Sequence, residues 1–198
     1  MTQTFIKKNR EGFTVFFTGL PAAGKTTVAQ NLLEKLTHRT KSRVILLDGD
    51  VVRKKYYPDL GFSKQARETH ARWIGHAASK ITRNGDIAIC ALIAPHDGVR
   101  KEVRAMVECN GGFILVHVST PVSVCENRDQ KGLYKKARAG AILQFTGVSD
   151  TYEEPSDAEI VVDMSQDTPG DATDEIMKYL FDRGLLMSDC KGSLRHKS

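Results

Sequence analysis

Short apolar runs alternate with longer stretches of mixed character along almost the whole chain. Five of these runs are continuous and rich in phenylalanine or β-branched residues, at 13–17, 44–47, 87–93, 113–118 and 160–162. A continuous run, in contrast to an alternating one, is typical of a strand that is buried on both faces. The pattern therefore predicts about five strands in a parallel sheet.

The stretches between the runs carry the spacing of helices. Apolar residues recur every three or four positions over 28–36, which predicts a helix there. Further helices are expected over 64–83 behind Ser63 as N-cap, behind Asp97 as N-cap to about 110, from about 122 behind Pro121, and over 173–183 before Gly184. Residues 51–63 are polar, and the pattern predicts neither helix nor strand for them.

Strands that alternate with helices predict a single α/β domain, with helices on both faces of a parallel sheet. The domain is expected to span 13–184, between a polar leader at 1–12 and a basic tail at 185–198. In such sheets, ligands bind at the carboxyl ends of the strands. That edge is therefore where functional side chains are expected.

Charge and composition argue against a nucleic-acid-binding protein and against a membrane-spanning one. The 198 residues carry a net charge of +5, and three of the excess charges (Lys191, Arg195 and Lys197) lie in the tail. A nucleic-acid-binding domain would need a basic face, so nucleic acid is not expected as a partner. No apolar run reaches about 18 residues, so no membrane span is expected. Four cysteines without metal-ligand spacing, and an N-terminus without a signal peptide, favour the cytoplasm.

A phosphate-binding motif follows the first predicted strand. Its sequence is Gly19-Leu20-Pro21-Ala22-Ala23-Gly24-Lys25-Thr26, which fits the P-loop pattern G-x-x-x-x-G-K-S/T between a strand and a helix. The backbone N–H groups of such a loop form an anion nest at a helix N-terminus. Lys25 supplies charge for the outer phosphates of ATP, and Thr26 supplies a hydroxyl for Mg²⁺. Thr27 completes the predicted nucleotide-binding set.

A second polar motif, Asp48-Gly49-Asp50, follows the second predicted strand, with Arg53 three residues on. Carboxylates that face a P-loop can hold Mg²⁺ through water, or can take a proton from an attacking hydroxyl. The alternative is a tight turn that uses Asp and Gly for backbone reasons. The neighbouring P-loop favours the functional interpretation.

Several further blocks carry a resemblance to a known family. They are 48–53 (DGDVVR), 60–63 (LGFS), Arg67 with Arg72, 125–138 (CENRDQKGLYKKAR), 145–147 (FTG) and 152–155 (YEEP). With them the chain resembles the adenylylsulfate (APS) kinases over about residues 12 to 183. These enzymes phosphorylate the 3′-hydroxyl of adenosine 5′-phosphosulfate (APS). The resemblance implies a P-loop kinase fold with a lid, and ATP and Mg²⁺ as cofactors.

The resemblance also implies roles for particular residues. Arg53 and Arg67 would grip the phosphosulfate, since a guanidinium fork binds two oxygens at once. Phe62 and Phe145 would sandwich the adenine, although core packing is the alternative for each ring. Residues 131–138 would form the lid, with a solvated basic face as the alternative. The remaining substrate-binding residues implied are Asp50, His70, Ile93, Ala94 and Lys131, and Arg128 would bind nucleotide.

This chain departs from the usual family pattern at several positions. Ala94 stands where Ser usually precedes the proline, and His70 stands where Asn is usual. The loop interior reads Pro21-Ala22-Ala23 instead of Ser-Gly-Ala, and Ser149 replaces a common Asp. His70 could still donate a hydrogen bond to substrate; a surface helix position is its alternative. None of these changes removes Lys25, Asp50, Arg53 or Arg67.

The resemblance implies that ATP and APS react to give ADP and 3′-phosphoadenosine 5′-phosphosulfate (PAPS). Lys25, Asp48 and Asp50 would carry the catalysis, with Asp50 orienting or deprotonating the 3′-hydroxyl. A homodimer in the cytoplasm and an association with ATP sulfurylase are further expectations. Two alternatives stay open at this point: a degenerate kinase domain that binds nucleotide and regulates a partner, and a kinase of another small nucleotide.

Overall fold

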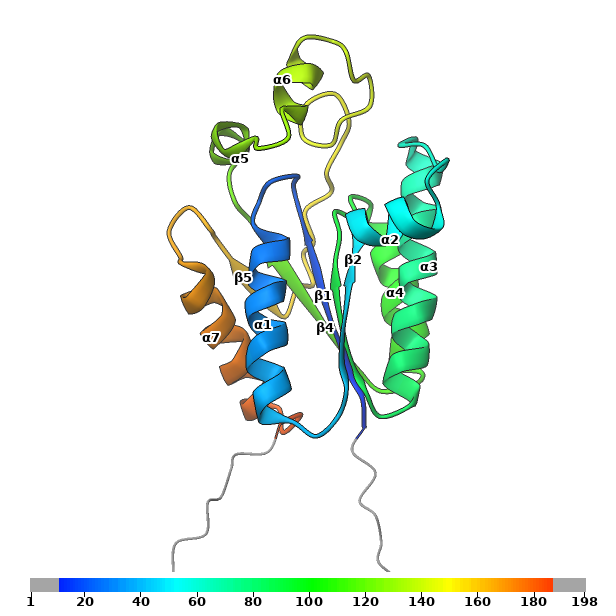
Figure 1. Cartoon of the computed structure of the whole chain (residues 1–198), viewed down its shortest axis with the longest axis vertical. Helices are drawn as coiled ribbons and strands as arrows, with labels where there is room; N and C mark the ends of the chain where they lie inside the picture. The colour runs from blue at the N-terminus through cyan, green and yellow to red at the C-terminus, as the bar shows by residue number, and fades with distance from the viewer. Residues whose placement is uncertain (1–10, 187–198) are drawn as a thin grey trace, which may run out of the picture.

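The computed structural model describes residues 11–186. Its five strands form one parallel sheet in the order β2-β3-β1-β4-β5 (Figure 1). The strands are β1 (Phe13–Gly19), β2 (Val44–Asp48), β3 (Ile87–Ala91), β4 (Gly112–Val118) and β5 (Ile160–Val162). The predicted fold class is confirmed. The predicted leader lies outside the described residues except for its last two, and so does most of the predicted tail.

Seven helices connect and cover these strands within the described residues. They are α1 (Lys25–Arg39), α2 (Gly49–Tyr56), α3 (Lys64–Arg83), α4 (Asp97–Glu108), α5 (Val122–Arg128), α6 (Leu133–Arg138) and α7 (Pro169–Asp182). The pattern did not predict α2, because its residues carry no continuous apolar stripe. Nor did it predict α6, which the sequence placed only as part of a lid.

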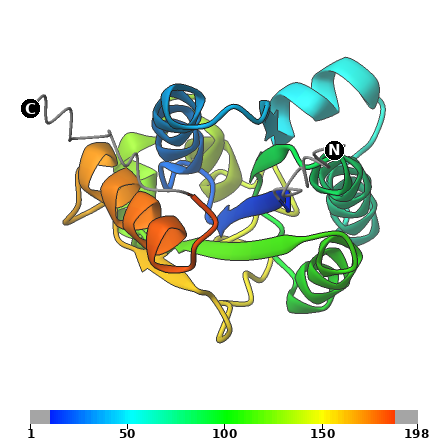
Figure 2. The same ribbon diagram turned by 90° about the horizontal axis from the view of Figure 1, so that it is seen from below.

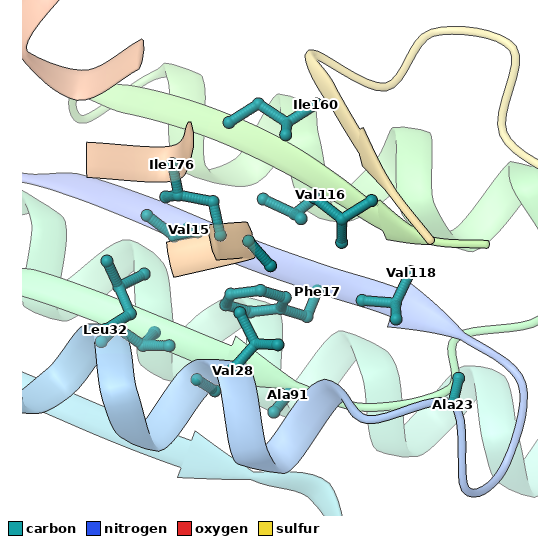
Figure 3. Close-up of a cluster of buried hydrophobic side chains, with 14 of the residues drawn as sticks. Val15, Phe17, Ala23, Val28, Leu32, Ala91, Val116, Val118, Ile160 and Ile176 are labelled. Atoms are coloured by element: carbon teal, nitrogen blue, oxygen red, sulfur yellow. The ribbon is translucent and has the colours of Figure 1, made fainter. Parts of the chain in front are cut away.

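The sheet separates two apolar cores. Phe13, Val15 and Phe17 of β1 face α1 and α7, whereas Phe16 faces α3 and α4. Figure 2 shows these two helix pairs on opposite sides of the sheet. Side chains from β1, β4, α1 and α7 meet in the first core (Figure 3). Both faces of the central strands β1, β3 and β4 are covered, so these strands lack polar alternation, as the continuous apolar runs predicted. The prediction of burial on both faces was wrong for the edge strand β5, where Val161 is 54 % exposed.

Helix starts show where the sequence interpretation was right and where it was wrong. Ser63 caps α3 as predicted, since its Oγ accepts from the N–H of Ala66 at 3.2 Å. Asp97 is the first residue of α4 and not its cap, a position that His96 occupies. Helix α7 begins at Pro169, four residues before the predicted start, because Thr168 and Asp171 form a capping box.

The carboxyl edge of the sheet is the end on which the functional motifs gather. The P-loop follows β1 there, α2 follows β2, and a loop leads from β3 into α4. The segment with α5 and α6, which contains the predicted lid at 131–138, projects beyond this edge (Figure 1). At the end of α2, Tyr57 stacks on Trp73 of α3, with ring centroids 3.7 Å apart.

Every helix within residues 11–186 is too short or too polar to cross a bilayer.

Candidate functional site

The P-loop turns sharply between β1 and α1. Gly19 has φ of +147° and Gly24 has φ of +109°, values that L side chains rarely adopt. A Cβ on Gly19 would also lie 2.5 Å from the carbonyl oxygen of Val118. Ala22, where the family usually has Gly, takes φ of +59° and so holds a left-handed conformation with a methyl group. Positive φ values at three positions make the sharp turn that a nest requires, and phosphate binding by the loop stays a prediction.

Lys25 is folded back onto this loop. Its Nζ donates to the carbonyl oxygens of Gly19 at 2.9 Å and Leu20 at 2.6 Å. The side chain is only 8 % exposed, and burial lowers the pKa of Lys25 to about 8. Arg128 approaches from the end of α5, where its Nη2 donates to the carbonyl of Met164 at 2.5 Å. Two cations are thus held close to the nest.

Thr26 and Asp48 join the start of α1 to the end of β2. The Thr26 hydroxyl donates to Oδ2 of Asp48 at 2.8 Å. The other oxygen of Asp48 accepts from the backbone N–H groups of Asp50 at 3.0 Å and Val51 at 3.1 Å, and so caps α2. A hydroxyl beside a carboxylate fits Mg²⁺, which prefers oxygen ligands and keeps several waters. Asp48 thus has the backbone role that the sequence left open as the alternative, since it caps α2, and its role at Mg²⁺ stays a prediction.

Asp50 meets the lid. Its Oδ2 accepts from Nζ of Lys131 at 2.5 Å, and this bond raises the pKa of Lys131. Both side chains are largely exposed, at 78 % for Asp50 and 67 % for Lys131. The structure therefore brings together two predicted site residues from distant parts of the chain.

Arg53, Phe62 and Arg67 form a second cluster beside Asp50. Phe62 is 61 % exposed, and the guanidinium of Arg53 lies 4.9 Å from its ring centroid. Arg53 donates to the carbonyls of Leu60 and Gly61. Burial and the charge of Arg67 lower the pKa of Arg53. Two neighbouring guanidinium groups that repel each other make a favourable place for an anion.

Arg67 links the two segments that carry the predicted adenine-stacking rings. Its Nε donates to the carbonyl of Phe62 at 2.8 Å, and its Nη2 donates to the carbonyl of Gln144 at 2.5 Å. Phe145, next in sequence, is 6 % exposed and packs edge-on against Tyr134. Phe62 is thus available to a ligand, whereas Phe145 is packed in the first core against Tyr134 of α6, which was its alternative interpretation.

His70 is buried, so its alternative interpretation as a surface residue was wrong. Its Nε2 lies 3.0 Å from the carbonyl oxygen of Gly49, which requires the proton on Nε2. Burial and the charge of Arg53 lower the pKa of His70 to about 4. Among the described residues, none hydrogen-bonds to the Nδ1 atom. His70 therefore supports the turn that carries Asp50.

The loop after β3 places Ile93 and Ala94 beside the start of the P-loop. The Thr18 hydroxyl donates to the carbonyl of Ile93 at 2.6 Å. Ala94 has φ of +41° and is 4 % exposed. Sequence reasoning missed Thr18, and it gave no role to Arg100 or Tyr152, which also contact this loop or Thr18.

The family assignment rests on a match that spans most of the chain. The model of the adenylylsulphate kinase family matches residues 11–163. The chain belongs to the adenylylsulphate kinase family. An adenylyl-sulfate kinase of Rippkaea orientalis is 43 % identical over 177 residues, which cover 89 % of this chain and 96 % of that protein. The family that the sequence motifs suggested is thus confirmed.

The chain is also similar to a solved structure and to part of a longer protein. The structure of the Mycobacterium tuberculosis APS kinase CysC in complex with AMPPNP and APS is 34 % identical, with a TM-score of 0.81. The match covers 86 % of this chain and 98 % of that one. A sulfate adenylyltransferase of Mycosarcoma maydis is 40 % identical over 94 % of this chain, which corresponds to 33 % of that longer protein.

Proposed function

We propose that this protein transfers the γ-phosphoryl group of ATP to the 3′-hydroxyl of APS, which yields PAPS and ADP. The observation that carries the proposal is the arrangement at one sheet edge. A P-loop nest with Lys25 lies beside the Thr26–Asp48 pair, and Asp50, Arg53 and Arg67 follow on the next elements. This order fits a donor site next to an acceptor site, in a chain that belongs to the adenylylsulphate kinase family.

The donor half of the site would hold ATP. The N–H groups of the nest and the ammonium of Lys25 would bind the phosphates, since both are donors without acceptor character. Lys25 would exchange its contacts to Gly19 and Leu20 for phosphate oxygens. Thr26 and Asp48 would hold Mg²⁺ directly or through water, and Mg²⁺ supplies neutralisation of the phosphate charge. Arg128 would bind the nucleotide from the lid side.

The acceptor half would bind APS. Arg53 and Arg67 would contact the phosphosulfate, and the exposed ring of Phe62 would stack on the adenine, with Phe145 supporting the lid on the other side. Asp50 would accept a hydrogen bond from the 3′-hydroxyl and take its proton late, because the transition state of phosphoryl transfer is loose. Lys131 would follow the lid onto the bound nucleotides. Closure of the lid excludes water, so that ATP is not simply hydrolysed.

A coupled ADP-release assay tests this proposal. ADP should form with ATP and APS together, and far more slowly with ATP alone or with AMP in place of APS. Lys25→Ala should abolish turnover and leave the fold intact, because the backbone donors of the nest remain. Turnover of the variant within about tenfold of the parent would contradict the assigned role of the P-loop. Equal rates with AMP and APS would indicate a kinase of another nucleotide.

We also infer that the protein is a homodimer located in the cytoplasm. A link to ATP sulfurylase is supported by the sulfate adenylyltransferase that contains a stretch similar to this chain. Sedimentation of the purified protein at several concentrations tests the dimer. Co-purification with a sulfurylase from the source cells tests the association.

A further inference from the structure

Arg100 of α4 is the largest side chain that is almost wholly buried, with 2 % of its surface exposed. Burying a guanidinium is costly unless its donors are satisfied, and here both Nη atoms have partners whereas Nε has none among the described residues. Nη1 donates to the carbonyl of Ala94 at 2.8 Å, and Nη2 donates to the carbonyl of Glu153 at 2.7 Å. A weaker contact reaches Oδ1 of Asp97 at 3.4 Å. One fork therefore joins two loops that lie far apart in the sequence.

The segment at Tyr152 and Glu153 adds further bonds to the same loop. The N–H of Glu153 donates to the carbonyl of Pro95 at 2.9 Å. Its carboxylate accepts from the N–H of Asp97 at 2.6 Å. The backbone between Ala94 and Asp97 is thus fixed from Arg100 on one side and from Glu153 on another.

Tyr152 connects this arrangement to the P-loop. Its hydroxyl lies 3.0 Å from Oγ1 of Thr18, whose own proton is donated to the carbonyl of Ile93 at 2.6 Å. Burial raises the pKa of Tyr152 to about 12, so the phenol keeps its proton at neutral pH and donates to Thr18. Thr18 directly precedes Gly19, the first residue of the nest. The hydrogen bonds therefore run from Tyr152 through Thr18 to Ile93.

The sheet places this loop between the two halves of the site. β3 lies between β1 and β2, so that Ala91 is in register with Phe17 on one side and with Asp48 on the other. The residues that follow β3 consequently stand between the phosphate nest and the turn of Asp50. Their backbone is unusual as well, since Ala94 has φ of +41° and needs support from its surroundings.

We propose that Arg100 and Tyr152 are positioning residues, which hold the carbonyls of Ile93 and Ala94 in place and thereby set the affinity for the phosphate acceptor. The identity of that acceptor as APS rests on the proposed function. Neither residue needs to contact a ligand, because each acts through the loop that it holds.

Two variants and a matched control separate this role from general stabilisation. Arg100→Lys keeps the charge but loses the fork, and Tyr152→Phe removes only the hydroxyl. The control is Arg104→Lys, one turn further along α4. Arg104 also uses a fork, donating to Glu159 at 2.7 and 3.0 Å, but it does not contact the loop after β3.

The first measurement needs no substrate. Amide hydrogen exchange of the folded protein should show that the N–H groups of Asp97 and Glu153 exchange about tenfold faster or more in Arg100→Lys, since their bonds depend on the loop geometry. Arg104→Lys should leave these two amides as in the parent. Unchanged exchange in Arg100→Lys would overturn the proposal, even if APS proves not to be the acceptor.

The second measurement is steady-state kinetics of the parent and all three variants. We expect the KM for APS to rise about tenfold in Arg100→Lys and about threefold in Tyr152→Phe, as for the loss of one or two hydrogen bonds. The KM for ATP should stay within about twofold. If the parent turns over APS, two outcomes would refute the inference. One is a KM for APS that is unchanged in both Arg100→Lys and Tyr152→Phe. The other is a KM for APS that rises equally in Arg104→Lys. A parent that does not turn over APS refutes the proposed function instead.

Discussion

Nζ of Lys131 lies 2.5 Å from Oδ2 of Asp50, and this contact is the bond between the lid and the predicted catalytic carboxylate. The two residues are 81 positions apart, and both are largely exposed. An exposed ion pair contributes between about 0 and 1 kcal/mol to stability. The contact is therefore easily exchanged for contacts to a substrate. It places a cation where the 3′-hydroxyl would come to lie.

Replacing Lys131 should affect substrate binding far more than stability. We expect Lys131→Met to change the free energy of unfolding by less than about 1 kcal/mol, because the lost pair is exposed. The KM for APS should rise roughly tenfold, the size of one charge-assisted contact. Denaturant unfolding and steady-state kinetics measure the two quantities. Lys178→Met, an exposed change on α7, serves as control and should leave the KM unaltered.

Asp50→Asn should lower kcat by about 10²–10⁴, the usual span for a general base. The substitution keeps size and one acceptor oxygen but loses the proton acceptor. ATP binding, measured by calorimetry, should change little. Asp59→Asn provides a control in an exposed loop beyond α2.

Replacing Asp48 should affect stability and Mg²⁺ binding, in contrast to replacing Asp50. Asp48→Ala should cost about 1 kcal/mol of stability through loss of the α2 cap, and it should raise the Mg²⁺ concentration needed for half-maximal turnover, because the oxygen partner of Thr26 is lost. Normal turnover by Asp50→Asn, together with an inactive Asp48→Asn, would show that the roles of the two carboxylates are reversed. Normal turnover by both would reduce the motif to a structural turn.

Arg67→Ala should weaken APS binding by about ten- to a hundredfold more than ATP binding. It should also cost about 1–3 kcal/mol of stability, because the carbonyls of Phe62 and Gln144 lose a buried donor. Calorimetry with each ligand and thermal unfolding provide the data. Arg72→Ala, on the same helix, removes two partly exposed ion pairs, to Glu68 and Glu102, and should affect neither ligand. Equal losses for both nucleotides would place Arg67 outside the APS site.

His70 makes part of the acid sensitivity of the fold predictable. Its pKa is about 4 in the folded protein, as burial and Arg53 disfavour the cation, against about 6.5 when unfolded. The unfolded chain therefore binds more protons between these values. The contribution of His70 to stability is complete above pH 6.5 and is lost as the pH falls toward 4.

Denaturant unfolding across this pH range tests the contribution of His70. The curve of His70→Asn should be flatter than that of the parent between pH 6.5 and 4. His76→Asn, exposed on the same helix, should keep the slope of the parent. A parent and a His70→Asn variant with the same slope would mean that His70 is not held neutral.

The sequence predicted the features that neighbouring residues encode. The P-loop was predictable because its nest, cation and hydroxyl are consecutive, and the five strands because each is a mostly apolar run. Helix α2 was not, since its only strong start signal is the cap formed by Asp48, a residue that the sequence marked for its chemistry. The sequence interpretation also missed the capping box that Thr168 and Asp171 form at the start of α7.

Contacts between distant segments were beyond sequence reasoning. The pairing of Asp50 with Lys131, and the fork of Arg100 on Ala94 and Glu153, depend on how loops meet above the sheet. No local pattern specifies such meetings. For the same reason Phe145, predicted as one half of an adenine sandwich, was not foreseen as a partner of Tyr134. The roles of the site residues stay predictions until the variants are measured.

Trp73, the single tryptophan of the chain, stacks on Tyr57, the residue that ends the helix carrying Asp50. An indole that is stacked on a phenol and partly open to water emits differently from one that is free of its partner. The protein thus contains a native fluorophore at the far end of α2. Rapid mixing with each nucleotide, followed at tryptophan emission, can time any movement of that helix without a dye or a coupling enzyme.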